Sequence, residues 1–296
     1  MRKNLFYLLI FIASNTFAQN NPIFERLTAI ANGGTIYYNI DGYSITKETL
    51  NFPFTEKGLK KIYRKYKIRK DDPRTTDSSI KTKHTYVYNN DKVTTGIVQH
   101  NSFYFLENKK KRVDIIRFSN INKLDKAFEL SMLTLILDNK IPKANFSSTS
   151  TDSINFAGRQ IKLGDPCRWM DVNSVQCPGH GQINWSVYKD FESANNAVQY
   201  QFEITKAKRG GKVISEEEVD VIFEDTEVKA KKVIYDFKGI NSLLAGMSGG
   251  ETLTIYYVTA PVRANYVGCV LSHWNNDVIQ ENGLPLLLGE VMSLKE

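Results

Sequence analysis

Long apolar segments and cysteines are both scarce in this sequence of 296 residues. After the first eighteen residues, the most apolar segment covers residues 130–137 and is much shorter than the roughly 20 residues that a membrane-spanning helix needs. Only three cysteines are present, and none lies near the N-terminus, where a lipoprotein would carry its lipid. We therefore expect neither a transmembrane anchor nor a lipid anchor.

Motifs for cofactors and catalysis are also missing. Gly179 and Gly181 lack the third glycine of a dinucleotide-binding loop, and the chain has no Cys-x-x-Cys-His pattern for haem attachment. No pair of catalytic carboxylates can be singled out, because the acidic run at residues 216–218 is typical of a solvated turn before a strand. The sequence therefore favours a protein without a cofactor and leans against an enzyme.

The first eighteen residues have the order of a cleavable signal peptide. Arg2 and Lys3 give a positive start, residues 5–13 are apolar, and small residues surround Ala18. The next residues are polar, so the apolar run is too short and wrongly flanked for a membrane anchor. We expect residues 1–18 to be removed and the mature chain to be exported, either to a periplasm or to the extracellular space.

The charge of the mature chain is divided unevenly. Residues 19–145 contain 23 Lys and Arg against 13 Asp and Glu, a net charge of +10, whereas residues 146–296 contain 14 against 19, a net charge of −5. The sign changes inside a polar stretch of small residues at 142–153, which is typical of a linker. We predict two α+β domains with mainly antiparallel sheets, a basic one at 19–145 and an acidic one at 146–296.

In the basic half, residue patterns predict five elements. They are a helix at 21–34, a hairpin at 35–50 turning at Asp41 and Gly42, a helix at 55–66, an antiparallel meander at 84–118 and a helix from Asn122 to before Pro142.

The acidic half is predicted to be mainly β, with one helix. Strands are expected at 154–163, 183–188, 219–223, 233–237, 252–258 and 265–274, the last two around a loop at Ala260 and Pro261. Asp190 caps the helix, whose continuation at 200–205 could also be a strand, and the type of residues 283–294 stays open.

Two cysteines lie in the most unusual stretch of the chain. Cys167 and Cys177 are ten positions apart and predict a disulfide in an exported protein, although Cys269 is an alternative partner for either. Cys269 by itself fits a small buried residue of a strand. The disulfide competes with a zinc site that uses Cys167, Cys177 and His180, and with a thiolate nucleophile at Cys177 assisted by His180 or His273.

The same stretch gives the weaker site candidates, His180 and Trp185. His180 lies between two glycines and fits an exposed turn residue without chemistry. If the protein is an enzyme, a hydrolytic site is expected here, near Cys177, His180 and Trp185.

A basic segment at residues 57–70 gives the binding candidates. Lys60, Lys61, Arg64 and Lys65 are predicted on one amphipathic helix, where they would suit an anionic surface, although solvated surface charge is the simpler explanation. We do not expect nucleic acid as a partner, since no recognition motif is present.

The function favoured by the sequence is an exported, non-catalytic protein that binds a partner of unknown identity, either a protein or an anionic surface of the cell envelope. A secreted or periplasmic hydrolase is the alternative from a different class. An inhibitor or immunity-type protein is a third possibility.

Overall fold

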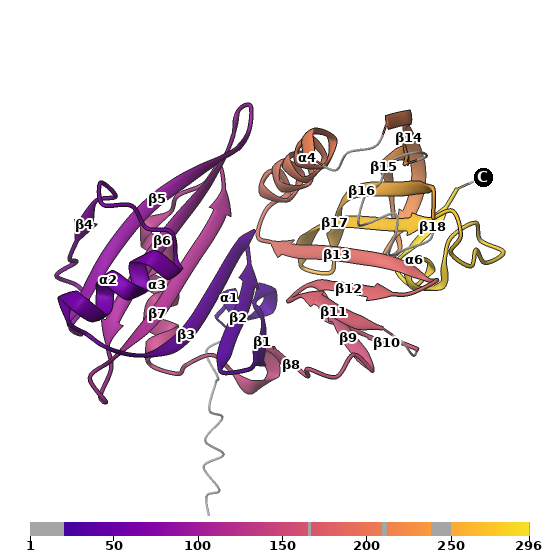
Figure 1. Cartoon of the computed structure of the whole chain (residues 1–296). Helices are drawn as coiled ribbons and strands as arrows, with labels where there is room; N and C mark the ends of the chain where they lie inside the picture. Colours follow the sequence, from indigo (N-terminus) through magenta and orange to yellow (C-terminus); the bar gives the residue numbers. More distant parts are fainter. Residues whose placement is uncertain (1–20, 165–166, 209–211, 238–249, 296) are drawn as a thin grey trace, which may run out of the picture.

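The computed structural model describes residues 21–295, apart from 165–166, 209–211 and 238–249. Strands hold 51% of the described residues and helices 19%, and the strands form two large, mostly antiparallel sheets, which confirms the α+β class. The two sheets lie side by side and each carries its own helices (Figure 1). The predicted signal peptide, residues 1–18, lies outside the described residues.

The first sheet has eight strands in the order β4-β5-β6-β7-β3-β2-β1-β8. Its strands are β1 (Thr28–Asn32), β2 (Thr35–Ile40), β3 (Tyr43–Pro53), β4 (Arg74–Thr75), β5 (His84–Thr94), β6 (Ile97–Glu107), β7 (Arg112–Ile121) and β8 (Phe146–Ser147). All neighbours are antiparallel except β1 and β8. The predicted hairpin at Asp41 and Gly42 and the meander β5-β6-β7 are confirmed.

Helices α2 (Glu56–Lys65) and α3 (Lys126–Leu137) cover opposite faces of this sheet. Ile62 of α2 belongs to a cluster with Phe103 and Phe105, whereas Met132 of α3 belongs to a cluster with Tyr104 and its neighbours. Successive β6 side chains point to opposite faces, so one strand supplies both clusters. The short helices are α1 (Ile23–Arg26) and a 3-10 turn at Lys143–Asn145.

The helix predicted at residues 21–34 is wrong beyond its first turn. Only Ile23–Arg26 is helical, and Thr28–Asn32 forms strand β1. Gly33 and Gly34 both have positive φ angles, 58° and 85°, and form the tight turn between β1 and β2 instead of ending a helix. Pairing with β2 therefore overrides the helical spacing of the apolar residues.

The cap predicted for the next helix also lies elsewhere. Asp125, and not Asn122, accepts a hydrogen bond from the backbone N–H of Phe128 at 3.0 Å and begins α3. The side chain of Asn122 is occupied by Val98 and Gly96 in the turn after β7.

The second sheet also has eight strands, in the order β11-β12-β13-β17-β16-β15-β14-β18. They are β11 (Arg168–Asp171), β12 (Ser174–Cys177), β13 (Gly181–Tyr188), β14 (Lys212–Phe223), β15 (Thr226–Asp236), β16 (Thr252–Val262), β17 (Asn265–Trp274) and β18 (Met292–Leu294). A separate hairpin of β9 (Ser153–Phe156) and β10 (Arg159–Lys162) and the short helix α6 (Leu286–Gly289) belong to the same half.

Two loop predictions in this half are wrong. Ala260 and Pro261 lie inside β16, and the chain turns at Arg263, which has a φ angle of 57°. Residues 216–218 lie within β14 and not in a turn. Glu216 is 3.2 Å from Lys231 on the neighbouring strand, so ion pairs across the sheet replace the expected solvation.

Helix α4 (Phe191–Lys208) resolves the ambiguity at residues 200–205, which are helical. It packs on the second sheet through Phe202, whose ring contacts that of Tyr257 edge to face at 5.5 Å. In Figure 1 this helix lies at the side of its sheet that faces the first sheet. None of the helices in the described part of the chain combines the length and hydrophobicity that crossing a bilayer requires.

The predicted linker at residues 142–153 carries the 3-10 turn and β8. Phe146 and Ser147 pair in parallel with β1 and so belong to the first sheet. The division into domains at residues 145 and 146 stays a prediction.

One buried acid in the first sheet gives a pH-dependent prediction. Glu129 of α3 is 1% exposed, accepts a hydrogen bond from the Tyr104 hydroxyl at 3.0 Å and lies 3.9 Å from Lys126. Burial raises the pKa of Glu129 above its ordinary value of 4.5. The native state therefore binds this proton more tightly than the unfolded state, and the resulting stabilisation is present below the ordinary pKa and lost as pH rises.

We expect Glu129→Gln to retain a side-chain oxygen that accepts from the Tyr104 hydroxyl and to remove the loss of stability at high pH. The variant should match the natural protein near pH 4 and exceed its free energy of unfolding by about 1 kcal/mol near pH 8. Urea unfolding at the two pH values measures the difference. A variant that becomes less stable than the natural protein as pH rises would contradict the prediction.

Candidate functional site

The predicted disulfide between Cys167 and Cys177 is confirmed. It joins the start of the edge strand β11 to the end of β12, and Cys177 is only 3% exposed. Neither sulfur is a thiol, so the predictions of a thiolate nucleophile at Cys177 and of zinc ligands at Cys167 and Cys177 are wrong. Cys269 is the free cysteine and is fully buried, as predicted, and burial raises the pKa of its thiol.

The other two candidates of this stretch have different surroundings. Trp185 is 1% exposed and packs against Phe156, at 5.2 Å between ring centroids, in the core of the second sheet. His180 lies in the turn between β12 and β13, but it is half-buried and not exposed as predicted, and its backbone oxygen accepts a hydrogen bond from Leu287 of α6. Gly181 must be glycine, because its φ angle is 93° and a Cβ atom would lie 2.5 Å from Leu288. Neither His180 nor Trp185 lines the cavity described below.

The four basic candidates lie together on α2. Lys60, Lys61, Arg64 and Lys65 are exposed on the side of the helix opposite to buried Ile62, which confirms that the helix is amphipathic. Lys65 forms an ion pair with Glu48 of β3 at 2.8 Å. Binding of an anionic surface by these residues stays a prediction.

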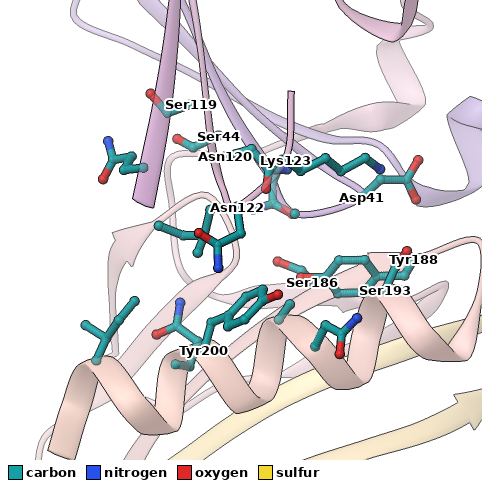
Figure 2. Close-up of a pocket in the computed structure, with 18 of the residues that line it drawn as sticks. Asp41, Ser44, Ser119, Asn120, Asn122, Lys123, Ser186, Tyr188, Ser193 and Tyr200 are labelled. Atoms are coloured by element: carbon teal, nitrogen blue, oxygen red, sulfur yellow. The ribbon is translucent and has the colours of Figure 1, made fainter. Parts of the chain in front are cut away.

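A cavity of about 600 Å³ lies between the two sheets and is lined by residues of both halves of the chain. Figure 2 shows its two walls, with Ser44, Ser119 and Asn120 on one side and Ser186, Tyr188 and Tyr200 on the other. We call it the cleft. Its walls come from the β2–β3 turn, β7 and the turn after it, the β11–β12 turn, β13 and α4.

The walls of the cleft are polar but carry little charge. Eight lining residues have amide side chains: Asn39, Gln99, Asn120, Asn122, Asn173, Asn184, Asn196 and Gln201. Seven have hydroxyl groups: Ser44, Ser119, Ser174, Ser186, Ser193, Tyr188 and Tyr200. Amides and hydroxyls both donate and accept hydrogen bonds, so the cleft offers mixed donors and acceptors over its whole surface.

Strand periodicity explains why the first sheet contributes a polar wall. On β7, Val113, Ile115, Arg117 and Ser119 point to the same face, because alternate residues share a face. The first two are buried in the cluster that α2 covers, whereas the last two line the cleft. One face of the sheet is therefore apolar under α2 and polar where it lies opposite α4.

Asp41, which forms a buried ion pair with Arg26, joins the two walls at one end of the cleft. Both carboxylate oxygens of Asp41 accept hydrogen bonds from Arg26, at 2.9 and 3.1 Å, and both residues are 8% exposed. Asp41 also accepts a hydrogen bond from the backbone N–H of Lys189, and its own N–H donates to Val187 of β13, each at 3.1 Å. The turn of the first sheet is thus fastened to the end of β13 in the second.

Arg117 is held on the polar wall by a chain of hydrogen bonds. Its Nε donates to Ser119 at 3.0 Å, Ser119 donates to Asn101 at 2.8 Å, and Asn101 donates to the carboxylate of Asp91 at 3.1 Å. The side chain is half-buried, and burial lowers the pKa of its guanidinium group. Among the described residues, no carboxylate oxygen lies within 4.0 Å of a guanidinium nitrogen of Arg117, the limit for an ion pair.

A buried amide on the opposite wall has an unused acceptor. Asn173 is 3% exposed and lines the cleft, where its Nδ2 donates to Asn39 of β2 at 3.3 Å. Its Oδ1 has no hydrogen-bond partner among the described residues. This oxygen is enclosed by the protein, and a buried amide oxygen without a donor costs free energy that other contacts of the fold must offset.

Two tyrosines complete the wall from the second half. Tyr188 ends β13 next to Gly42, and Tyr200 of α4 points into the cleft in Figure 2. Burial raises the pKa of Tyr188 to about 12, so its hydroxyl stays protonated at neutral pH. Tyr188 is only 5% exposed, whereas the half-buried ring of Tyr200 offers an apolar face in an otherwise polar cavity.

No residue of the cleft was a site candidate from the sequence. The polar residues of β6 and β7 are separated from Asn173 and Tyr200 by many positions in the chain, and no spacing links them. The one available signal is that β6 and β7 each have an apolar part and a polar part, as in Arg117 and Ser119 after Val113 and Ile115 on β7.

No family model matches this chain, and no curated protein sequence matches it. The structure search returned the crystal structure of the di-domain ARO/CYC StfQ from the steffimycin biosynthetic pathway, which covers 83% of this chain and 73% of that one at 10% sequence identity. The TM-score is 0.15, which is too low to support any inference about fold or function.

Proposed function

We propose that this chain is an exported, non-catalytic binding protein of two domains, and that it holds a saccharide in the cleft between its two sheets. The observation that carries the proposal is the lining of the cleft, where fifteen of the lining residues are amides or hydroxyls. Saccharide hydroxyls both donate and accept hydrogen bonds, and such walls match them without a dominant charge. The disulfide fits the oxidising compartment to which the proposed signal peptide leads.

The shape of the cleft supports a small, polar ligand. A volume of about 600 Å³ lies within the range of roughly 300–1,000 Å³ that is common for small-molecule sites. The half-buried ring of Tyr200 provides an apolar face against which the C–H side of a sugar ring packs.

The acidic groups of the cleft support binding over hydrolysis. Glycoside hydrolysis generally needs two free carboxyl groups on either side of the scissile bond. Asp41 is a lining residue, but Arg26 and the N–H of Lys189 occupy its oxygens. The other lining acid, Asp171, is exposed at the β11–β12 turn.

The test uses two matched double variants of α4 in the full mature chain. Asn196 and Tyr200 line the cleft, whereas Asn195 and Gln199 lie on the same helix and line a different hollow against β15 and β16. An array of neutral and acidic oligosaccharides identifies a bound saccharide, and titration calorimetry then measures its affinity.

We expect Asn196→Ala with Tyr200→Ala to weaken saccharide binding at least about 10-fold, since a stacking ring and a hydrogen-bonding amide are lost. Asn195→Ala with Gln199→Ala should leave the affinity unchanged. The proposal fails if no saccharide binds, or if both double variants lose affinity equally.

A further inference from the structure

Arg117 is the feature of the cleft that the proposed function leaves unexplained. An arginine that is half-buried has lost part of its hydration, and such a group is ordinarily compensated by a carboxylate in ion-pair contact. Here the nearest chain of hydrogen bonds ends on Asp91, but two side chains, Ser119 and Asn101, stand between the two charges. The guanidinium therefore faces the cleft with its charge uncompensated by direct contact.

The hydrogen bond to Ser119 uses only the Nε of Arg117. No described residue accepts a hydrogen bond from either of its terminal nitrogens within the 3.5 Å limit of such a bond. Two parallel N–H donors of an arginine match the two oxygens of a carboxylate, and the fixed Nε orients them.

The other charges of the cleft do not provide the missing anion. Asp41 is neutralised by Arg26 at 2.9 Å. Asp171 is exposed and has its carboxylate bonded to the backbone N–H of Val172 at 2.7 Å. Lys123 is the second cation of the lining, so with Asp41 paired to Arg26 the cleft holds two cations against the one carboxylate of Asp171. An anionic group on the ligand would complete the site.

We infer that the ligand of the cleft is an acidic saccharide, and that Arg117 binds its carboxylate through the two terminal nitrogens of the guanidinium group. This inference rests on the proposed function, because it names the class of saccharide that the same cleft binds. The amide and hydroxyl groups of the walls hold the sugar hydroxyls, and Arg117 supplies the selection between an acidic sugar and its neutral counterpart. The chain Asp91–Asn101–Ser119 positions the guanidinium for this contact.

The experiment compares uronic-acid oligosaccharides with their methyl esters, which keep the hydroxyls and remove the charge. Affinities are measured by titration calorimetry for the natural chain and for the variants Arg117→Gln, Arg117→Lys and Arg168→Gln. Arg168 is the matched control, since it is exposed on the edge strand β11, bonds to Gln176 and lies outside the cleft.

The natural chain should bind the best acid at least about 10-fold more tightly than its ester. Arg117→Gln should bring this ratio close to one, Arg117→Lys should retain part of it, and Arg168→Gln should keep it in full. Loss of the ratio with retained binding of the ester shows that Arg117→Gln still folds.

Two results separate this inference from the proposed function. If the natural chain binds acid and ester equally, or if Arg117→Gln keeps the preference, the carboxylate contact is overturned while saccharide binding in the cleft stands. If no neutral or acidic saccharide binds, the proposed function itself fails and the inference fails with it.

Discussion

Replacing Asp41 with alanine is expected to lower the free energy of unfolding by about 3–5 kcal/mol, the usual cost of leaving one member of a buried ion pair without its partner. Arg26 is 8% exposed and would keep its charge in the absence of the carboxylate that now binds it at 2.9 and 3.1 Å. The N–H of Lys189 would lose its acceptor in the same step. Equilibrium unfolding in urea, followed by circular dichroism, measures the loss.

The double variant Arg26→Met with Asp41→Asn is the control for this prediction. It removes both charges, retains a side-chain oxygen that can accept from Lys189, and should recover most of the stability that Asp41→Ala loses. A loss below about 1 kcal/mol for Asp41→Ala would show that water compensates Arg26 and that the pair is not an essential junction between the sheets.

Local signals account for the parts of the fold that the sequence predicted correctly. Asp41 and Gly42 have φ angles of 47° and 78°, as a tight hairpin turn requires, and the dipeptide alone indicates this. Likewise, Thr55 caps α2 by accepting a hydrogen bond from Gly58, just before the amphipathic stretch. In both cases the residues that decide the structure lie within a few positions of each other.

The failures have non-local causes. The spacing of Ile23, Leu27 and Ile30 fits a helix, but Ile30 lies in β1 because β2 is available as a partner, and this pairing is not visible in a window of residues 21–34. The acidic run at 216–218 fits a turn by its composition, but it forms a strand because Lys231 of the neighbouring strand β15 lies opposite it and neutralises part of its charge.

The cleft could not be predicted because it exists only between the two sheets. Asn39 and Asn173 contact each other at 3.3 Å although 134 positions separate them in the chain. Arg117 has the same residue type as several exposed arginines, and only its half-burial without a carboxylate partner distinguishes it. The basic helix α2 can be recognised in the sequence because its charges lie within a few positions of each other. The polar groups of the cleft are instead dispersed along the chain.

Removing the disulfide is the second change with a large expected effect. Cys167→Ala with Cys177→Ala should lower the free energy of unfolding by about 3 kcal/mol, because a link across ten positions restricts the unfolded chain and its loss frees it. The disulfide holds β11, an edge strand of only four residues, to β12. Without it, we expect β11 to separate from the sheet before the other strands. Urea unfolding of the natural and variant chains without reductant measures the change.

A reducing agent is the control that isolates the cross-link from side-chain packing. It should lower the stability of the natural chain to that of the double variant and leave the double variant unchanged. Thiol counting checks the premise: the unreduced natural chain should give one reactive thiol after denaturation and none when folded, since Cys269 is fully buried. Three thiols in the denatured, unreduced chain would show that the bond does not form, and then neither the stability difference nor the oxidising compartment has support.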